Sequence, residues 1–252
     1  MQVPYLSIVV PAYNEERNFK RGVLDEIANF LNRQHFSWEV LLVNDGSTDN
    51  TPRLLSQFVR NNRGFRQVNI PHGGKFKTIS KGVAEAKGEY ILFCDFDQST
   101  PISEVNKFLP YFKNRVGVII GSRVGKGSER VGDPFFRYFR SRVLNFIIQL
   151  VLFRGIEDTQ CGFKAFKKNV AIKLFKNLKV TPLAKPKGGF MGPFDIELLF
   201  LAHKFGYKII SVPVIWHYFP SHRLSTLAEP LKFILDILRI RLYDWLGKYG
   251  FN

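Results

Sequence analysis

Two carboxylates stand two residues apart in the segment FCDFDQST, residues 93–100, directly after the apolar run GEYILFCD. That run predicts a strand buried on both faces. Successive side chains of a strand alternate between its faces, so we expect Asp95 and Asp97 on one face, about 7 Å apart, and Phe96 on the other. Two like charges so close favour a bound cation, and carboxylate oxygens favour Mg²⁺ or Mn²⁺. The alternative is a polar strand end that leads into a turn at residues 99–101.

Strand and helix patterns that could position these carboxylates alternate along the first half of the chain. We expect strands over residues 5–13, 38–47, 65–70 and 90–95, and helices over residues 14–34, 48–62 and 73–88. Asn14 is the expected N-cap of the first helix. This alternation predicts an α/β fold with a mostly parallel sheet covered by helices, which binds ligands at the carboxyl ends of its strands.

Three polar motifs follow three of the predicted strands. They are PAYNE (11–15), NDGSTD (44–49) and DFD (95–97). Because the carboxyl ends of parallel strands share one edge, these motifs should converge there. Any single motif could be turn chemistry, but three together favour a nucleotide site.

Composition limits the classes of protein that fit the chain. Its 252 residues can form one large core, and no Gly/Ser-rich or Pro-rich linker divides them. Cys94 and Cys161 give no disulfide framework and are expected to be reduced thiols of a cytoplasmic protein. The first residues lack the pattern of a signal peptide. A net charge of +16 favours a polyanionic partner, which could be nucleic acid, an anionic membrane surface or a phosphorylated substrate.

Six segments occur in an order that resembles a known family. They are LSIVVPAYNEE, VNDGSTD, the D-x-D, GSR (121–123), DTQCGFKAF (158–166) and FDIELLFLAHKFGYKIISVPV (194–214). From residue 6 to about residue 225 the chain resembles family-2 glycosyltransferases of GT-A fold, and more narrowly the dolichyl- or polyprenyl-phosphate sugar synthases. The resemblance implies one domain with a nucleotide-sugar-binding half (1–115), an acceptor half (116–225) and a C-terminal amphipathic helix (226–252).

The resemblance also implies a donor site. The residues expected to bind the nucleotide sugar are Pro11, Tyr13, Glu15, Val43, Asp45, Lys75, Asp95, Phe96, Asp97, Arg223 and Ser225. Within this set Val43 and Asp45 would meet the base, and Arg223 and Ser225 would close a loop over the diphosphate. Asp95 and Asp97 would hold the metal ion, Mg²⁺ or Mn²⁺, that bridges the diphosphate.

The chain departs from the family pattern at three points. Asn44 stands in the first position of the DDGS motif, and Phe76 replaces the second glycine of a Gly-Lys-Gly segment. Lys75 of that segment could contact a phosphate or be a solvated lysine of the first helical turn. Gln98 comes one residue earlier than in relatives that use a D-x-D-x-Q metal site, so we leave it outside the metal site.

The acceptor implied by the resemblance is a lipid phosphate, held by Arg123 and Arg137. Arginine suits this role because its planar fork pairs two phosphate oxygens at once. A phosphate monoester, with a second pKa of about 6, is already nucleophilic at pH 7 and needs no general base. The expected catalytic residues are Asp97, Asp195 and Arg123. Asp195 stands where other family-2 enzymes keep a base, and here we expect it to orient the sugar or an arginine.

Two amphipathic segments are expected to meet a membrane surface. Residues 133–153 carry a polar stripe at Arg137, Ser141, Asn145 and Gln149, and their apolar stretch of eleven residues, 143–153, is shorter than the ~20 that span a bilayer. An interfacial helix is expected here, with a core helix as the alternative. The second segment has an apolar face of Leu231, Ile234, Leu235, Leu238, Leu242 and Trp245. We therefore expect a peripheral protein on the cytoplasmic face of a membrane, without a transmembrane helix.

The sequence leaves three functions to compare. The first is inverting, metal-dependent transfer of a hexose to dolichyl or polyprenyl phosphate, with UDP-glucose the favoured donor and GDP-mannose still open. The second keeps the donor but uses a sugar hydroxyl or a polysaccharide as acceptor, which would make Asp195 an indispensable base. The third is nucleic-acid binding, suggested by the charge alone. The basic residues cluster with Phe, Ile and Leu and no nucleic-acid motif is present, so we expect no nucleic-acid partner.

Overall fold

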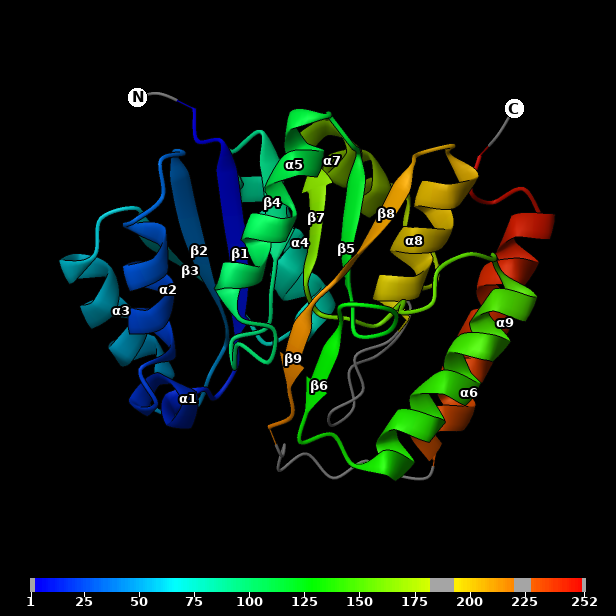
Figure 1. Ribbon diagram of the computed structural model, residues 1–252, viewed down its shortest axis with the longest axis horizontal. Coiled ribbons are helices and arrows are strands. Elements are labelled where there is room, and N and C mark those ends of the chain that lie inside the picture. Colours follow the sequence, from blue (N-terminus) through cyan, green and yellow to red (C-terminus); the bar gives the residue numbers. More distant parts are fainter. Residues whose placement is uncertain (1–2, 182–192, 220–227, 251–252) are drawn as a thin grey trace.

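A seven-stranded sheet forms the centre of the molecule (Figure 1). The computed structural model describes residues 3–181, 193–219 and 228–250. The strand order is β3-β2-β1-β4-β7-β5-β8. The strands are β1 (Leu6–Ala12), β2 (Trp38–Asp45), β3 (Phe65–Ile70), β4 (Tyr90–Phe93), β5 (Val118–Ser122), β7 (Lys164–Lys167) and β8 (Ile209–Pro213).

All strands of this sheet except β7 run in the same direction. The pairs β1–β2, β1–β4, β2–β3 and β5–β8 are parallel, whereas β7 is antiparallel to both of its neighbours, β4 and β5. The carboxyl ends of six strands therefore share one edge of the sheet with the amino end of β7. This edge is the lower one in Figure 1.

Two short strands extend the structure beyond this edge. They are β6 (Glu129–Val131) and β9 (Ile215–His217), which pair in parallel and place Arg130 opposite Trp216. The backbone N–H of His217 donates a hydrogen bond of 2.7 Å to the carbonyl of Ser99. The small sheet thereby lies next to the segment that follows β4.

Helices cover both faces of the sheet. One face packs against α2 (Val23–Leu31), α3 (Thr51–Asn61), the 3-10 helix η1 (Ile102–Lys107) and α5 (Leu109–Lys113). The other packs against α4 (Lys75–Glu85), α7 (Lys168–Asn177) and α8 (Phe194–Lys204). Neighbouring strand residues such as Ile8 and Val9 enter opposite cores, as the period of a strand requires.

Helices α6 (Phe135–Val151) and α9 (Ala228–Trp245) lie side by side at the end of the molecule farthest from α3 (Figure 1). Their inner residues Ile148, Ile237 and Ile240 are fully buried in the core. Arg241 of α9 donates hydrogen bonds of 2.7 Å to the carbonyls of Val151 and Leu152. These bonds satisfy carbonyls at the C-terminus of α6 and fix the two helices to each other.

The helix expected over residues 14–34 is wrong in two respects. It is two helices, α1 (Glu16–Lys20) and α2, separated at Gly22, whose φ of 77° is left-handed. Asn14 is also no N-cap, because its φ is 55° and its side chain instead accepts a 2.8 Å hydrogen bond from the N–H of Thr48. The tertiary contact with the loop after β2 replaces the local cap.

The D-x-D segment is a turn and does not continue β4, which ends at Phe93. The N–H of Gln98, with a left-handed φ of 52°, donates to the carbonyl of Asp95. Strand alternation was therefore the wrong reason to place Asp95 and Asp97 together. The turn brings the two carboxylates together by a different route.

A membrane-crossing helix is missing from the described part of the chain. None of the helices in residues 3–181, 193–219 and 228–250 combines the length and the apolar character that crossing a bilayer requires.

Candidate active site

Asp95 lies close enough to Asp97 to affect the ionisation of the Asp97 side chain. The Asp97 side chain is half-buried and accepts a 2.9 Å hydrogen bond from the N–H of Ser99. Burial raises the pKa of Asp97, and the charge of Asp95 raises it further. A pair of carboxylates with this mutual repulsion is stabilised by a cation held between or beside them. The donor set therefore fits a divalent metal ion, Mg²⁺ or Mn²⁺.

Lys75 already places one positive charge at this pair. It is the first residue of α4, and its ammonium group forms an ion pair with Asp95. Burial alone would lower the pKa of Lys75, but the carboxylates of Asp95, Asp195 and Asp97 together raise it. Lys75 is therefore charged and largely buried, so it is not a solvated lysine of the first helical turn. Its contact with a donor phosphate stays a prediction.

The absence of a side chain at Gly162 leaves room for the Asp95 carboxylate. A Cβ atom on Gly162 would lie 2.1 Å from Asp95 Oδ2, far inside van der Waals contact. Because β7 runs antiparallel, the residues just before it reach the same sheet edge as the D-x-D. This close approach explains why the DTQCGFKAF segment carries a glycine at this point.

Asp195 is paired with a buried lysine that sequence reasoning missed. Lys164 of β7 is fully buried, and its ammonium donates a 2.7 Å hydrogen bond to Asp195 Oδ1 and another to the Cys161 carbonyl. Asp195 is in the first turn of α8. Among the described residues the partner of this carboxylate is a lysine and not an arginine, and its expected role in orienting the sugar stays a prediction. A lysine in the apolar strand GFKAF was the available signal, because a buried charge requires a partner.

Asp45 closes the loop that precedes α4. Its carboxylate accepts hydrogen bonds from the N–H groups of Gly73 (2.8 Å) and Gly74 (2.9 Å). His72 Nδ1 lies 3.0 Å from Asp45 Oδ2, and its ring stacks on Tyr13 with centroids 4.3 Å apart. The structure thus brings the ends of β1 and β2 together, as expected, and adds His72 to the set.

The other expected donor-site residues differ in what they present at this edge. Val43 and Phe96 have side chains buried in opposite cores, so only their main chains are available to a nucleotide. Pro11 is half-buried near the end of β1. The N–H of Glu15 donates a 2.8 Å hydrogen bond to Thr51 Oγ1. The remaining two, Arg223 and Ser225, lie outside the described residues.

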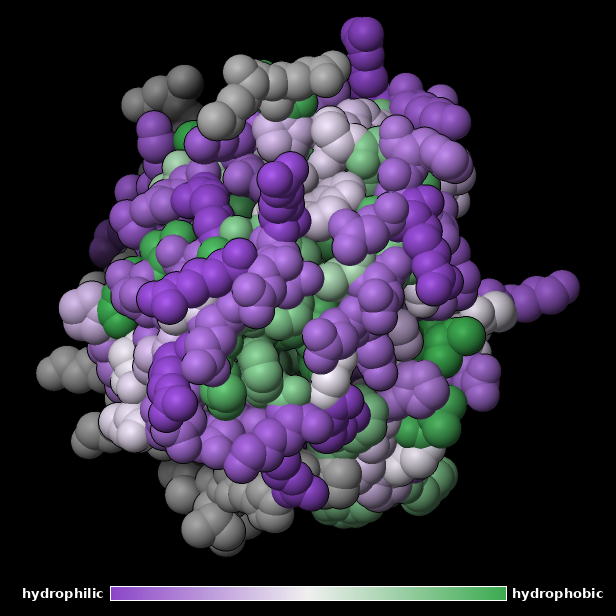
Figure 2. All heavy atoms as spheres, turned by 90° about the vertical axis from the view of Figure 1, so that its left-hand side faces the viewer, coloured by the Kyte–Doolittle hydropathy of each residue, from purple (hydrophilic) through white to green (hydrophobic). Residues whose placement is uncertain are grey.

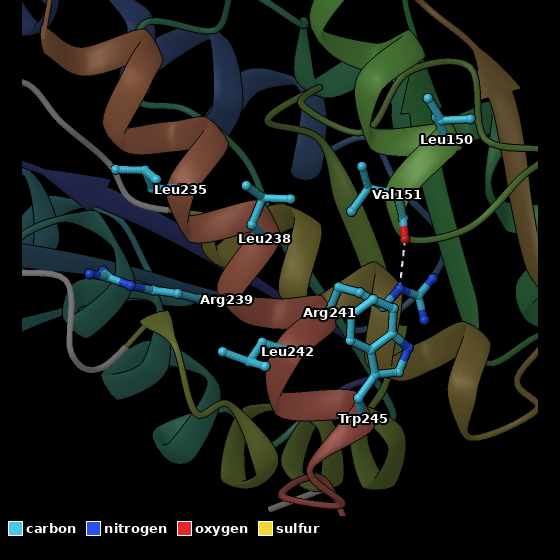
Figure 3. Close-up of a pocket in the computed structure, with 8 residues that line it drawn as sticks. All are labelled: Leu150, Val151, Leu235, Leu238, Arg239, Arg241, Leu242 and Trp245. Atoms are coloured by element: carbon cyan, nitrogen blue, oxygen red, sulfur yellow. Dashed lines mark hydrogen bonds between the residues drawn. The ribbon is translucent and has the colours of Figure 1, made fainter.

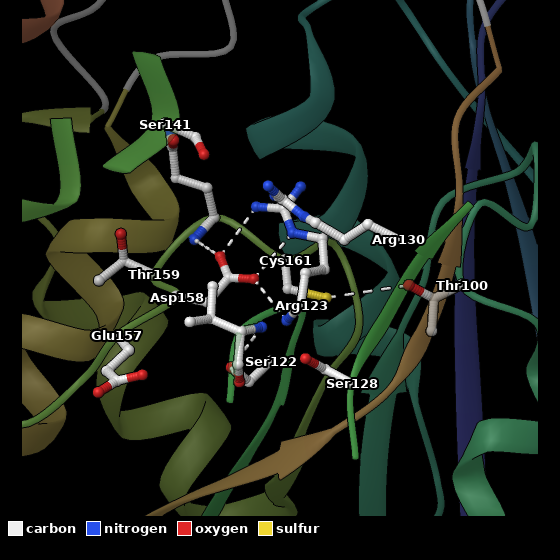
Figure 4. A network of polar contacts seen from close by, with 12 residues as sticks. Thr100, Ser122, Arg123, Ser128, Arg130, Ser141, Glu157, Asp158, Thr159 and Cys161 are labelled. Atoms are coloured by element: carbon white, nitrogen blue, oxygen red, sulfur yellow. Dashed lines mark hydrogen bonds and ion pairs between the residues drawn. The ribbon is translucent and has the colours of Figure 1, made fainter. Parts of the chain in front are cut away.

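Arg123 is held by a two-pronged ion pair at the end of β5. Its Nε and Nη2 donate to the two carboxylate oxygens of Asp158, each at 2.8 Å, and its backbone N–H adds a third bond of 2.8 Å (Figure 4). The pKa of Asp158 is lowered because, although burial alone would raise it, the charge and hydrogen bonds of Arg123 outweigh burial. Two of the five guanidinium N–H groups are used, which leaves three that could bind an anion.

Three arginines gather around the indole ring of Trp216, and we call this group the arginine cluster. The guanidinium carbons of Arg123, Arg130 and Arg137 lie 5.4, 5.8 and 5.2 Å from the ring centroid. Each distance is within the range of cation–π attraction. Arg123 and Arg137 were expected in one site, and the structure brings them together. Arg130 and Trp216 were missed, since neither stands in a recognisable motif.

The D-x-D supplies only two protein ligands to a metal ion. Within residues 3–181, 193–219 and 228–250, no group of three or more His, Cys, Asp or Glu side chains is arranged to hold a metal. Among the described residues, Asp95 and Asp97 alone would hold the metal, and oxygens of the diphosphate and water could complete its coordination, as is common for Mg²⁺.

The sequence matches known proteins over most of its length. Residues 7–175 match the family model of "Glycosyl transferase family 2". Proteins named dolichyl-phosphate beta-glucosyltransferase are 30% identical in Dictyostelium discoideum, covering 96% of this chain and 76% of the relative, and 32% identical in Drosophila melanogaster, covering 97% and 76%. The human protein of that name is 30% identical, with 97% and 77% covered.

Solved structures share the fold at lower identity. Staphylococcus aureus TarS 1–349, in complex with UDP-GlcNAc, superposes with a TM-score of 0.62 at 18% identity, covering 96% of this chain and 66% of that one. Glucosyl-3-phosphoglycerate synthase from Mycobacterium tuberculosis, in complex with Mn²⁺, UDP and glucosyl-3-phosphoglycerate, gives 0.58 at 18% identity, covering 99% and 81%.

Proposed function

The chain belongs to glycosyl transferase family 2, and on that premise we propose that it transfers glucose from UDP-glucose to the phosphate of a dolichyl or other polyprenyl phosphate. It is a glycosyltransferase of GT-A fold. The names of its relatives support the proposed donor and acceptor. In this proposal residues 1–115 bind the nucleotide sugar and residues 116–225 bind the acceptor.

One observation carries the proposal, namely that the arginine cluster adjoins the D-x-D. Trp216 of the arginine cluster lies on β9. The backbone N–H of the next residue, His217, donates a hydrogen bond to the carbonyl of Ser99. Ser99 in turn donates to Asp97. An anionic acceptor held by the arginines would thus lie beside a sugar diphosphate held at Asp95 and Asp97. This juxtaposition suits attack by a phosphate oxygen on the anomeric carbon, with inversion.

The reaction that we propose needs no general base. A phosphate monoester is largely dianionic at pH 7 and is the nucleophile itself. The bond that forms joins a phosphate oxygen to C1 of glucose, and the bond that breaks joins C1 to the β-phosphate oxygen of UDP-glucose. The electron pair leaves with UDP. Arg123 and Arg137 orient the nucleophile, and Lys75 lies where it can offset charge on the departing diphosphate.

The pairing of Asp195 with Lys164 supports a positioning role for that carboxylate. Asp195 Oδ1 already accepts a 2.7 Å hydrogen bond from the Lys164 ammonium, so this oxygen is engaged in a structural contact. We assign Asp195 to hold Lys164, and through it the segment around Cys161, at the sheet edge. A hydroxyl acceptor would require Asp195 to take a proton, so Asp195→Asn separates the two functions.

Asp95 and Asp97 are the residues that would hold Mg²⁺ or Mn²⁺. When bound, such an ion would supply Lewis-acid stabilisation to the departing diphosphate. The crowding of the two carboxylates and the recruitment of Lys75 support this assignment.

A membrane surface is the proposed location of the acceptor. The end of the molecule formed by α3 and β3 is covered mostly by hydrophilic residues (Figure 2). In contrast, all exposed large hydrophobic side chains of the described residues except Val3, Val131 and Leu246 lie on α6 and α9. The most exposed are Phe135, Phe136, Phe146, Leu150, Leu231 and Trp245. Such a concentration of apolar surface is typical of a membrane or protein contact.

The polar stripe of α6 supports this orientation because it faces the protein. Asn145 is buried and bonds to the Ile156 carbonyl and to Thr159, and Gln149 accepts a bond from the N–H of Gly155. Asn145 and Gln149 of the stripe therefore contact the loop that follows α6, and the exposed phenylalanines of this helix face away from the protein. Leu150, Leu238, Leu242 and Trp245 line an open groove of about 570 Å³ between α6 and α9 (Figure 3).

A transfer assay with purified chain tests the proposal. The protein is incubated with polyprenyl phosphate, Mn²⁺ and either labelled UDP-glucose or labelled GDP-mannose, and lipid-linked sugar is extracted. We expect glucose transfer that requires the phosphate, with polyprenol as the inactive control. Transfer to polyprenol or to soluble sugars, but not to polyprenyl phosphate, would contradict the proposal, and a preference for GDP-mannose would correct the donor.

A further inference from the structure

Arg130 carries buried polar atoms that the described residues leave without a hydrogen bond. Its side chain is 13% exposed, and its Nε and Nη1 make no hydrogen bond to any described residue. Nη1 lies 3.1 Å from Asp133 Oδ2, but the two groups are not aligned for a hydrogen bond. Buried N–H groups of a guanidinium are costly to leave unbonded. Both carboxylate oxygens of Asp133 also lack a hydrogen bond among the described residues, so this close ion pair leaves polar atoms of both partners open to a further hydrogen-bonding group.

The charges around Arg130 do not balance. Arg123, Arg130 and Arg137 face two carboxylates of the described chain, Asp133 and Asp158. Asp158 is fully engaged by Arg123, and Asp133 is 3.8 Å from Arg137 Nε. Burial lowers the pKa of Arg130, and the nearby charge of Arg123 lowers it further. Among the described residues, three guanidinium groups therefore face two carboxylates, and the side chains of Arg123 and Arg130 are the mostly buried ones of the three.

Two aromatic rings fix the direction of the Arg130 side chain. Its guanidinium carbon lies 5.1 Å from the Tyr138 ring centroid and 5.8 Å from that of Trp216. Parallel pairing of β6 with β9 sets Arg130 opposite Trp216. Figure 4 shows the guanidinium groups of Arg123, which directly follows β5, and of Arg130 on β6 next to each other. Two like charges held together in this way favour an anion that both can contact.

We infer that Arg130 binds the acceptor phosphate directly, as a third arginine beside Arg123 and Arg137, with Trp216 as the shared platform of all three. The inference rests on the proposed function, because it takes the phosphate to be that of the lipid acceptor. A dianionic phosphate has three terminal oxygens, and three guanidinium groups can pair with all of them. An uncharged alcohol cannot form an ion pair with Arg130, so the same contact would favour a phosphate acceptor over an alcohol.

The test compares acceptor and donor kinetics in variants of the full chain. Arg130→Gln should raise the KM for polyprenyl phosphate about 10- to 100-fold and leave the KM for UDP-glucose within about twofold. Arg130→Lys should give a smaller increase, since an ammonium keeps the charge but lacks the fork. The matched control is Arg60→Gln, an exposed arginine of α3 at the end of the molecule farthest from α6, which should change neither constant.

Direct binding separates this inference from the proposed function. Calorimetric titration with geranyl phosphate, inorganic phosphate and UDP measures the acceptor and donor sites without turnover. Wild type should bind geranyl phosphate more tightly than Arg130→Gln does, whereas UDP affinity should be equal in both. If wild type binds geranyl phosphate in this way but transfers no glucose to polyprenyl phosphate, the proposed function fails and the phosphate site stands.

Three results would overturn the role of Arg130. They are an unchanged acceptor KM in Arg130→Gln, equal increases in donor and acceptor KM, and no binding of geranyl or inorganic phosphate by wild type. The second result would mean that Arg130 only supports the local structure. If Arg130→Gln does not fold, as judged by its Tm, the acceptor KM of Arg130→Lys decides the question.

Discussion

The ammonium group of Lys75 is ion-paired with Asp95, the first carboxylate of the D-x-D. The lysine opens α4 and the aspartate follows β4, so the loop at the end of β3 and the turn after β4 meet at this contact. A cation from the protein thus neutralises part of the site at which we place a divalent metal ion. This relationship gives a direct prediction for metal binding.

Replacing Lys75 by Met should tighten the binding of Mn²⁺ in the absence of nucleotide by several-fold. The ammonium competes for Asp95 and repels a second cation, and both effects disappear in the variant. Titration calorimetry or the EPR signal of free Mn²⁺ measures the affinity. Lys77→Met, an exposed lysine on the same helix, is the control and should bind Mn²⁺ like wild type. Weaker Mn²⁺ binding by Lys75→Met would show that Lys75 supports the metal site.

Asp97→Asn should abolish glucose transfer without weakening the metal-free fold. The pKa of Asp97 is raised in the folded state, so the folded chain binds this proton more tightly than the unfolded chain does. The free energy of unfolding therefore falls as the pH rises through the raised pKa and Asp97 ionises. An uncharged Asn avoids this loss. In EDTA at pH 7, the Tm of the variant should equal or exceed that of wild type. A large drop in Tm, or full wild-type activity in excess EDTA, would contradict the assignment.

Gly162→Ala should reduce transfer strongly, on the order of 100-fold, while the protein stays folded. The added Cβ would lie 2.1 Å from Asp95 Oδ2 and must displace that carboxylate from its position. Misplacement of a positioning group by about 1 Å costs on the order of 100-fold in rate. Gly117→Ala is the matched control, because its Cβ would meet its nearest neighbours at 3.5 Å. Equal activity of the two variants would mean that Asp95 needs no fixed position.

The surface formed by the exposed apolar side chains of α6 and α9 should bind anionic liposomes. Removal of aromatic residues from this surface should weaken that binding. Phe139 and Phe146 are 57% and 66% exposed, so their joint replacement by Ser removes apolar surface with little effect on the core. Flotation with phosphatidylserine vesicles at low salt measures the association, which should fall as salt rises. The double change to Leu keeps the apolar area and should retain binding. Wild type that stays unbound at low salt would remove the membrane proposal.

Both cysteines should resist thiol reagents in the folded protein. Burial raises the pKa of the Cys94 thiol to about 12, and burial followed by the charge of Asp158 raises that of Cys161. Almost no thiolate is therefore present at pH 8. Ellman's reagent should report no reaction at pH 8 until denaturant is added, and then two thiols per chain. Rapid reaction of the native protein would mean that the region around Cys161 opens in solution.

The sequence by itself determined the classes of element and the edge at which the polar motifs gather. The apolar runs that become β1, β2 and β4, and the amphipathic segments that become α6 and α9, are recognisable because periodicity is a property of neighbouring residues. The order of the motifs also indicated the family that the comparison confirmed. Since parallel strands share one carboxyl edge, the approach of Tyr13, Asp45 and Asp95 followed from the pattern alone.

Only the tertiary structure decided which side chains become partners at that edge. Asn14 bonds to Thr48 where a local cap was expected, and the D-x-D forms a turn where a strand was expected. Arg130 and Trp216 face each other because β6 pairs with β9, a pairing between segments far apart in the chain. Such contacts depend on chain reversals and on the burial of charge, and neither leaves a periodic signal in the sequence.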